Sequence, residues 1–341
     1  MLSLNEIRSL HLEISSYCNA RCPLCPRNLF GYPFNGGYEE TNLTLDLIKK
    51  RLSPEFISKL NQILFNGNFG DFHMNPEALA IVEYFRQSNP NIAIRISTNG
   101  SARNLQFWKD LAKLKTKVDF CLDGLEDTHH LYRQDTDWNK IINNAKAFIE
   151  AGGIAIWKMI PFDHNKHQIK ECKQLSVDLG FSNFFLNDRG RDRGPVFNRQ
   201  GDRTHILGKP KASENKLIIL KKIEHAEYWI NKNTNDGFLT RDIPDTKPKC
   251  HTLLSRDIYI SAEGYVYPCC FLGFSPETYS FGQMGSLNKR IKNIMSNNSL
   301  HDHDLETCIE WFDKVQESWD IDSYEKGRIY NCDITCNGCK R

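Results

Sequence analysis

The alternation of short apolar runs with helical patterns, from about residue 10 to residue 188, constrains this chain most. Such alternation is typical of repeated βα units around a parallel sheet. Six βα units predict an α/β fold, an open partial (β/α)6 barrel, with its functional groups at the carboxyl ends of the strands. The six expected strands are residues 10–15, 62–66, 92–97, 118–123, 154–160 and 183–187.

Helix start and stop signals lie between these runs. Ser53-Pro54-Glu55 and Asn75-Pro76-Glu77 each offer a capping side chain, a proline at the first helical position and an early acid. Gly152-Gly153 and Gly180 follow apolar-periodic stretches and suit left-handed helix C-caps. These signals support helices between the predicted strands.

The alternation of apolar strand segments with helical segments stops after the sixth strand segment. Residues 189–210 are rich in Arg, Asp, Gly and Asn, so we expect a linker or an active-site loop there. A long helix is expected over residues 213–231, and residues 258–268 predict a β-hairpin. A chain of 341 residues favours one large domain with a small appendage. The expected parts are a core over 1–190, a linker loop and bridging helix over 191–249, and a small α+β domain over 250–341.

The composition names no partner. The formal net charge of +2 arises from 44 basic and 42 acidic residues, which gives no field that favours nucleic acid or a membrane surface. The sequence has no apolar run of about 18 residues and no signal peptide in its first ten residues, so we expect a cytoplasmic protein. Twelve cysteines in a reducing compartment indicate metal ligation rather than disulfides, because C-x3-C-x2-C occurs near each end.

Cys18, Cys22 and Cys25 directly follow the first predicted strand. Three thiolates can hold three irons of a [4Fe–4S] cluster and leave the fourth iron without a protein ligand. Zinc is the alternative, but zinc normally takes a fourth ligand nearby. His11 is the only close residue that offers one, and its place in the preceding strand favours packing or a polar barrel interior.

This motif, placed after the first strand of a partial barrel, resembles the radical S-adenosylmethionine (SAM) superfamily over about residues 8–190. The resemblance implies that Cys18, Cys22 and Cys25 hold a cluster whose open iron is chelated by SAM. It also implies that an electron from this cluster cleaves SAM, and that the resulting 5′-deoxyadenosyl radical abstracts hydrogen from a substrate. The residue before the third cysteine, usually aromatic in the family, is Leu24 here and would contact adenine.

Further SAM contacts are implied at the ends of the next three strands. Residues 66–71, Asn-Gly-Asn-Phe-Gly-Asp, resemble the glycine-rich motif that receives the SAM amino group, although the family has Gly-Gly-Glu; a simple turn is the alternative. Residues 97–100 resemble the segment that binds the ribose and carboxylate, with an Asn-Gly turn as the alternative. The fourth strand ends in the family's Asp-Gly element. The implied SAM-binding residues are Leu24, Gly67, Asn68, Gly70, Asp71, Ser97, Asn99 and Asp123.

A second group of cysteines follows in the C-terminal part. Cys250 and a Gly-x4-Cys pattern ending at Cys269 precede a final group, Cys332, Cys336 and Cys339. This arrangement resembles the Twitch domain, a shortened relative of the SPASM domain, which implies one auxiliary [4Fe–4S] cluster. Cys250 and Cys269 match its two opening ligands, and two of the last three would complete the set. The C-x2-C spacing favours Cys336 with Cys339, and Cys332 competes with them.

Two alternatives stay open for this region. The cysteine count, which includes Cys270 and Cys308, just permits two incomplete cluster sites, as in a full SPASM domain. Cys308 lies in a helical pattern and is better explained by packing. Four thiolates at these spacings would also suit a structural zinc site.

The resemblance narrows the substrate to two classes. Twitch and SPASM enzymes act on ribosomally made peptides or on small molecules such as aminoglycosides and nucleotides. We favour peptide crosslinking, oxidation or epimerisation, with dehydrogenation or rearrangement of a small metabolite as the alternative and a non-catalytic zinc protein as the alternative of another class. Flavodoxin or ferredoxin would serve as electron donor. The first strand begins about ten residues from Met1, which leaves no room for an N-terminal peptide-recognition domain and argues against a leader-guided peptide, although another chain could supply the recognition.

Two features bear on the outcome of the reaction. Cys121 lies two residues before Asp123, so alternation along the strand places both side chains on one face, toward the barrel interior. A thiol there could donate hydrogen to a substrate radical, as radical SAM epimerases do, although packing is the common role of a buried cysteine. The arginines of residues 188–193 could bind phosphate or carboxylate, or form internal salt bridges.

Overall fold

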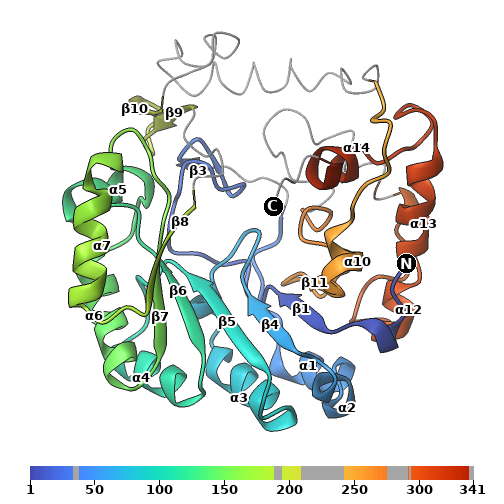
Figure 1. The fold of residues 1–341 in the computed structure, drawn as a ribbon, viewed down its shortest axis with the longest axis horizontal. Helices are drawn as coiled ribbons and strands as arrows, with labels where there is room; N and C mark the ends of the chain where they lie inside the picture. Colours follow the sequence, from blue (N-terminus) through green and yellow to red (C-terminus); the bar gives the residue numbers. More distant parts are fainter. Residues whose placement is uncertain (34–37, 188–193, 209–241, 275–290, 292, 338–341) are drawn as a thin grey trace.

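The structure, a computed structural model, describes residues 1–33, 38–187, 194–208, 242–274, 291 and 293–337. Its centre is an eight-stranded sheet with the order β12-β11-β1-β4-β5-β6-β7-β8 (Figure 1). The six predicted strands are confirmed as neighbours that run parallel, with ends shifted by one to three residues. They are β1 (Ser9–Leu12), β4 (Gln62–Phe65), β5 (Ala93–Thr98), β6 (Lys117–Cys121), β7 (Ile154–Met159) and β8 (Asn183–Leu186).

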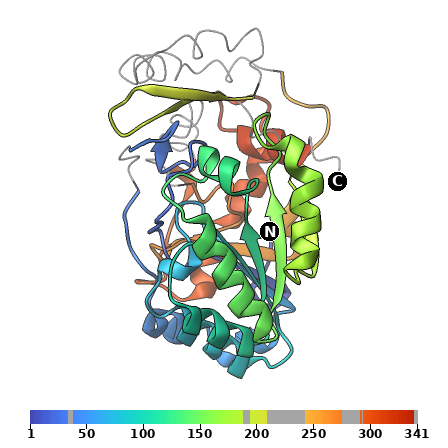
Figure 2. The ribbon, with the colours of Figure 1, turned by 90° about the vertical axis from the view of Figure 1, so that its left-hand side faces the viewer.

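Helices connect these strands and cover the outer face of the sheet (Figures 1 and 2). The core between the two layers is aromatic: Phe65 packs on Phe85, and Phe120 packs on Trp108 and Phe148. The helices are α1 (Leu45–Arg51), α2 (Pro54–Ser58), α3 (Ala78–Ser88), α4 (Leu105–Lys113), α5 (Glu126–Tyr132), α6 (Trp138–Glu150) and α7 (Ile169–Asp178), with 3-10 turns at Leu4–Glu6, Phe72–Met74 and Lys166–Gln168.

Local signals set several of these boundaries. The Ser53 hydroxyl accepts a hydrogen bond from Phe56 N at 3.2 Å, as expected of the α2 N-cap. Gly152 and Gly180 have φ of +89° and +83°, which confirms the left-handed C-caps. The expected helix start, with Asn75 as the cap and Pro76 as the first helical residue, is wrong by two residues, because α3 begins at Ala78 after the cap position Glu77. Asn75 instead donates to two backbone carbonyls, Ile14 O and Leu43 O, and so fixes the chain after β1.

The expected loop over residues 189–210 is wrong for its described part. Residues 194–207 form an antiparallel hairpin of β9 (Gly194–Phe197) and β10 (Arg203–Leu207). Its buried residues, Pro195, Val196, Phe197 and Leu207, are too few to give a strand pattern in a polar sequence. A smaller antiparallel pair joins β2 (Asn28–Leu29) to β3 (Tyr32–Pro33). The predicted helix over 213–231 lies outside the described residues.

The predicted C-terminal hairpin is confirmed as β11 (Asp257–Ile260) and β12 (Val266–Tyr267). It does not stand apart, because β11 pairs in parallel with β1, with Leu12 opposite Ile260. The hairpin therefore extends the barrel sheet on its first edge. The other described elements here are α10 (His251–Ser255), α12 (Leu305–Ile309), α13 (Phe312–Glu317), a 3-10 turn at Ser318–Asp320, α14 (Tyr330–Cys332) and a π-helical turn at Asp333–Asn337. No helix within the described residues is long and apolar enough to span a bilayer.

Candidate functional site

Cys18, Cys22 and Cys25 lie in the loop after β1, at the carboxyl end of the parallel strands. The loop is closed by Cys25 N, which donates to Cys22 O at 3.0 Å. Burial raises the pKa of the Cys22 thiol to about 11. Burial also raises the pKa of the Cys18 thiol, and the nearby sulfurs of Cys22 and Cys25 raise it further. The thiols of Cys18 and Cys22 therefore keep their protons until a metal replaces them.

The donor set fits a cluster with one open iron. His11, the only expected fourth ligand, is engaged elsewhere: its Nε2 lies 2.8 Å from Asn66 O and its ring packs edge-on against Tyr259. Three thiols with no fourth ligand suit a [4Fe–4S] cluster better than zinc. Within the part of the chain that the structure describes, no three or more His, Cys, Asp or Glu side chains are arranged to hold a single metal ion, so neither cysteine group forms a single-ion site.

Two side chains donate N–H groups to the sulfurs. Asn99 Nδ2 lies 3.6 Å from Cys18 Sγ, and Arg133 Nη1 lies 3.7 Å from Cys22 Sγ. The backbone N–H of Ala20 donates to Cys18 Sγ at 3.4 Å. Donors of this kind stabilise the negative charge of thiolate ligands and tune the metal that they hold.

Asp123 acts on the site through Arg133. Its Oδ2 accepts from Arg133 Nε at 2.6 Å and its Oδ1 accepts from Ile160 N at 2.6 Å. Both oxygens of the fully buried carboxylate are thus used within the protein, and they hold the guanidinium beside Cys22. Asp123 therefore shapes the site. The sequence analysis missed Arg133, whose only signal was its position ten residues after the Asp-Gly element.

The expected glycine-rich motif lies against the end of β1. A Cβ atom at Gly70 would lie 1.7 Å from Ser15 O, and one at Gly67 would lie 2.5 Å from Glu13 Oε1, so both positions need glycine for close approach. Phe69 N and Gly70 N each donate to Glu13 Oε1 at 2.8 Å. Glu13, which the sequence analysis also missed, therefore holds this loop next to the cysteine loop.

Asp71 ties the ends of β4 and β5 together. Its carboxylate accepts from Thr98 Oγ1 at 2.6 Å and from Asn99 N at 2.7 Å, and it lies 3.0 Å from Nδ1 of His73. Burial acts to raise the pKa of Asp71, but the charge of His73 and these hydrogen bonds outweigh it and lower the pKa. Binding of the SAM amino group by Asp71 stays a prediction. The carboxylate oxygens of Asp71 already accept hydrogen bonds from within the protein.

Ser97 and Cys121 share the inner face of the sheet. Ser97 Oγ and Cys121 Sγ lie 3.6 Å apart, on the adjacent strands β5 and β6. Leu24 is half-buried and packs in the apolar cluster around this loop, together with Val196 and Leu207 of the hairpin.

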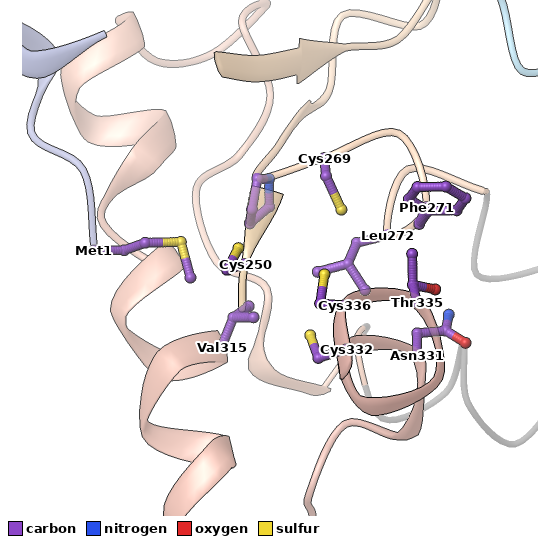
Figure 3. Close-up of a pocket in the computed structure, with 11 residues that line it drawn as sticks. Met1, Cys250, Cys269, Phe271, Leu272, Val315, Asn331, Cys332, Thr335 and Cys336 are labelled. Atoms are coloured by element: carbon purple, nitrogen blue, oxygen red, sulfur yellow. The ribbon is translucent and has the colours of Figure 1, made fainter. Parts of the chain in front are cut away.

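The C-terminal cysteines form a second site. Figure 3 shows the sulfur atoms of Cys250, Cys269, Cys332 and Cys336 around one pocket. A hydrogen bond with the thiol of Cys336 lowers the pKa of Cys250. Cys339 lies outside the described residues. The remaining lining residues are Met1, Pro268, Phe271, Leu272, Val315, Asn331 and Thr335.

A buried ion pair fixes the turn that carries two of these cysteines. Arg328 donates to both oxygens of Asp333, at 2.7 and 2.9 Å, and Tyr324 Oη donates to Asp333 at 3.1 Å. Asp333 lies between Cys332 and Cys336 in the sequence, so the pair holds both thiols toward the pocket. Cys308 is fully buried in α12, as its packing role predicts.

Comparison with known families agrees with this geometry. The profile of the radical SAM superfamily matches residues 12–174, and that of an iron–sulfur cluster-binding domain, SPASM, matches residues 250–340. Domains of these kinds bind a [4Fe–4S] cluster with SAM and auxiliary iron–sulfur clusters, respectively. No curated protein matches the chain.

Solved structures share the fold at low identity. Streptococcus suis SuiB is 14% identical, with a TM-score of 0.50 over 79% of this chain and 62% of SuiB. SuiB bound to its precursor peptide SuiA is 16% identical, with a TM-score of 0.50 over 82% of this chain and 64% of that one. Native anSMEcpe with bound AdoMet is 15% identical, with a TM-score of 0.52 over 89% of this chain and 80% of that one. The chain thus belongs to the radical SAM superfamily and carries a SPASM-type iron–sulfur domain in its C-terminal part.

Proposed function

We propose that this protein reductively cleaves SAM and abstracts hydrogen from a peptide, as a maturase that crosslinks, oxidises or epimerises it. The observation that carries the proposal is the set of three thiols at the carboxyl ends of the parallel strands, to which the described residues add no fourth ligand. A [4Fe–4S] cluster and SAM, when bound, supply the hydrogen-abstracting radical, after one electron from a donor such as flavodoxin or ferredoxin.

The chain's own residues have separate tasks in this proposal. Cys18, Cys22 and Cys25 hold the cluster, and Asn99 and Arg133 stabilise its thiolates. The loop over residues 66–71 receives the SAM amino group, and its two glycines let it lie close against Glu13 and Ser15 at the end of β1. The barrel interior then places the substrate hydrogen near the reactive carbon.

Further SAM contacts are part of the same proposal. Leu24 would pack on adenine, and Ser97 and Asn99 would bind the ribose and carboxylate. Asn68, whose amide already donates to a backbone carbonyl at 2.8 Å, would act through the position of its loop. Asp71 and Asp123 would order the strand ends from which these groups project.

The auxiliary cluster would accept an electron from the substrate radical or help to position it. We propose Cys250, Cys269, Cys332 and Cys336 as its ligands, because these four thiols line one pocket. The C-x2-C spacing favours Cys336 and Cys339 as the last two ligands. The proposal takes Cys332 and Cys336 instead. Cys339 would enter the set only if it displaced one of the four.

A peptide substrate is favoured over a small metabolite by two structures of similar fold. One is SuiB bound to its precursor peptide SuiA, and the other is anSMEcpe bound to AdoMet and the Cp18Cys peptide. Dehydrogenation or rearrangement of a small metabolite is the second candidate. A cytoplasmic location, which would keep the cysteines reduced, belongs to the same proposal.

The deciding test combines metal analysis with electron paramagnetic resonance of anaerobically reconstituted protein. We expect about eight irons per chain, falling to about four in a Cys18→Ala/Cys22→Ala/Cys25→Ala variant. The signal that shifts on SAM addition should vanish in that variant. Cys308→Ala, which alters a buried cysteine outside both sites, should keep all the iron.

Substrate class is tested separately with deuterated substrates. A maturase should transfer deuterium from a peptide into 5′-deoxyadenosine, and the peptide should lose two hydrogens or gain one solvent deuterium. Deuterium transfer from a small alcohol or sugar alone would support the metabolite candidate instead. Zinc in place of iron, with no SAM cleavage, would end both proposals.

A further inference from the structure

The turn over residues 269–274 lies between the two cofactor sites. At one end, Cys269 lines the auxiliary pocket (Figure 3). Immediately after it, the carbonyl of Cys270 accepts a hydrogen bond from Asn68 Nδ2 at 2.8 Å. At the other end, the ring of Phe274 lies edge-on to Phe69, with centroids 6.0 Å apart. The turn thus touches the loop that we assign to SAM at two successive residues.

The turn is internally rigid. Leu272 N and Gly273 N both donate to Cys269 O, each at 3.1 Å. These bonds tie the backbone of the auxiliary ligand to the residues that pack on the SAM loop. A displacement of Cys269 would therefore move the whole turn.

A second connection runs through Tyr259. Gly273 packs flat against its ring, since a Cβ atom there would lie 2.2 Å from Tyr259 Cε1. The Tyr259 hydroxyl donates to Glu13 Oε2, and the other oxygen of Glu13 accepts from Phe69 N and Gly70 N. The loop over residues 66–71 thus has two connections to the C-terminal part, one direct contact with the turn and one through Glu13 and Tyr259. All of these groups are in contact, and the Tyr259 and Glu13 side chains are buried.

We propose that the turn over residues 269–274 couples the two sites, so that SAM binds more tightly when the auxiliary pocket is filled. A cluster bound to Cys269 fixes the turn, and the turn fixes the loop over residues 66–71 through Asn68, Phe69 and Glu13. By thermodynamic reciprocity, SAM also strengthens the binding of the auxiliary cluster. This inference rests on the proposed assignment of the loop to SAM.

The test is a double-mutant cycle read out as the dissociation constant of SAM, measured anaerobically by equilibrium dialysis. Cys250→Ala/Cys336→Ala removes the auxiliary cluster without altering the turn, and Asn68→Ala/Phe274→Ala cuts the contacts between turn and loop. Couplings of this kind change affinity by about 5-fold to 150-fold. With the native turn and loop, loss of the auxiliary cluster should raise the dissociation constant of SAM at least about fivefold. In the Asn68→Ala/Phe274→Ala variant, the same loss should raise it less than about twofold.

Four irons retained in each auxiliary-cluster variant show that the first cluster and its fold persist. Equal SAM affinity with and without the auxiliary cluster would overturn the coupling, as would an equal loss in both backgrounds. Gly70→Ala separates this failure from failure of the proposed SAM loop, because its Cβ atom would collide with Ser15 O. If Gly70→Ala leaves SAM affinity unchanged, the loop assignment itself is wrong and the coupling falls with it.

Discussion

At the residue scale, the groups that organise the first site have partners far away in the sequence. The three cysteines could be predicted, because one fixed spacing carries their chemistry. Glu13 and Arg133 could not: Glu13 bonds to residues 56 and 246 positions away, and Arg133 contacts a sulfur 111 positions away. A single polar residue without a motif gives no sign of such a contact until the fold brings its partner near.

Arg133 should raise the reduction potential of the first cluster. Its guanidinium stabilises the added negative charge of the reduced state, so Arg133→Gln should lower the midpoint potential by about 65 mV, the one-electron equivalent of a hydrogen bond to a charged group worth about 1.5 kcal/mol. An anaerobic redox titration followed by paramagnetic resonance measures this change. Arg27→Gln separates the hydrogen bond from the charge, because the Arg27 guanidinium lies near the sulfurs of Cys18 and Cys25 but donates to the carbonyl of Cys18 and to no sulfur in the described contacts. Equal potentials in native protein and Arg133→Gln would refute the effect.

Glu13 should make stability depend on pH. Burial outweighs its hydrogen bonds and raises its pKa from 4.5 to about 7, so the folded state binds the proton more tightly than the unfolded state. Its contribution to stability is therefore present below about pH 4.5 and is lost as pH rises to about 7, a change of about 3 kcal/mol. Glu13→Gln keeps an acceptor for Phe69 N and removes the titration. Urea unfolding at pH 5 and pH 8 should favour the variant at the higher pH, and parallel behaviour of the two proteins would contradict this assignment.

Cys121 tests which outcome follows hydrogen abstraction. If its thiol quenches a substrate radical, Cys121→Ala should still cleave SAM but should no longer place a solvent hydrogen on the substrate. Cys172→Ala, which alters another buried cysteine, is the control. Mass spectrometry of products formed in deuterated water distinguishes the cases. Unchanged product in Cys121→Ala leaves packing, with its contact to Ser97, as the role of this thiol.

At the element scale, the parallel strands were predictable because short apolar runs recur between helical patterns along the sequence. The β9–β10 hairpin was not, since its order comes from packing of a few side chains on the cysteine loop. Leu207 is fully buried against that loop, while Ile206, its neighbour on β10, is 36% exposed. Leu207→Ala should therefore open the cover of the first site and speed iron loss in air several-fold, whereas Ile206→Ala should not. Equal rates of iron loss, followed by absorbance of the reconstituted protein, would show that the hairpin gives no protection.

At the scale of the whole molecule, the two cofactor parts share one sheet. A division at residue 250 was predicted from the cysteine pattern, yet β11 lies beyond that point and pairs with β1 along four residues. Removal of residues 250–341 would leave β1 as an unpaired edge strand. It would also remove the Tyr259 hydroxyl that donates to Glu13 and expose apolar side chains that pack against β11 and β12. Unpaired apolar edges favour aggregation.

Truncation after residue 249 should therefore destroy the first site as well as the second. We expect the truncated chain to aggregate or to bind less than one cluster, although all three N-terminal cysteines remain. The full-length Cys250→Ala/Cys336→Ala variant is the control, because it loses the auxiliary ligands and keeps β11 and β12. Size-exclusion chromatography with iron analysis separates the outcomes. A monomeric truncated chain with four irons and normal SAM binding would show that the barrel is complete without its C-terminal strands, and that the shared sheet does not support the first site.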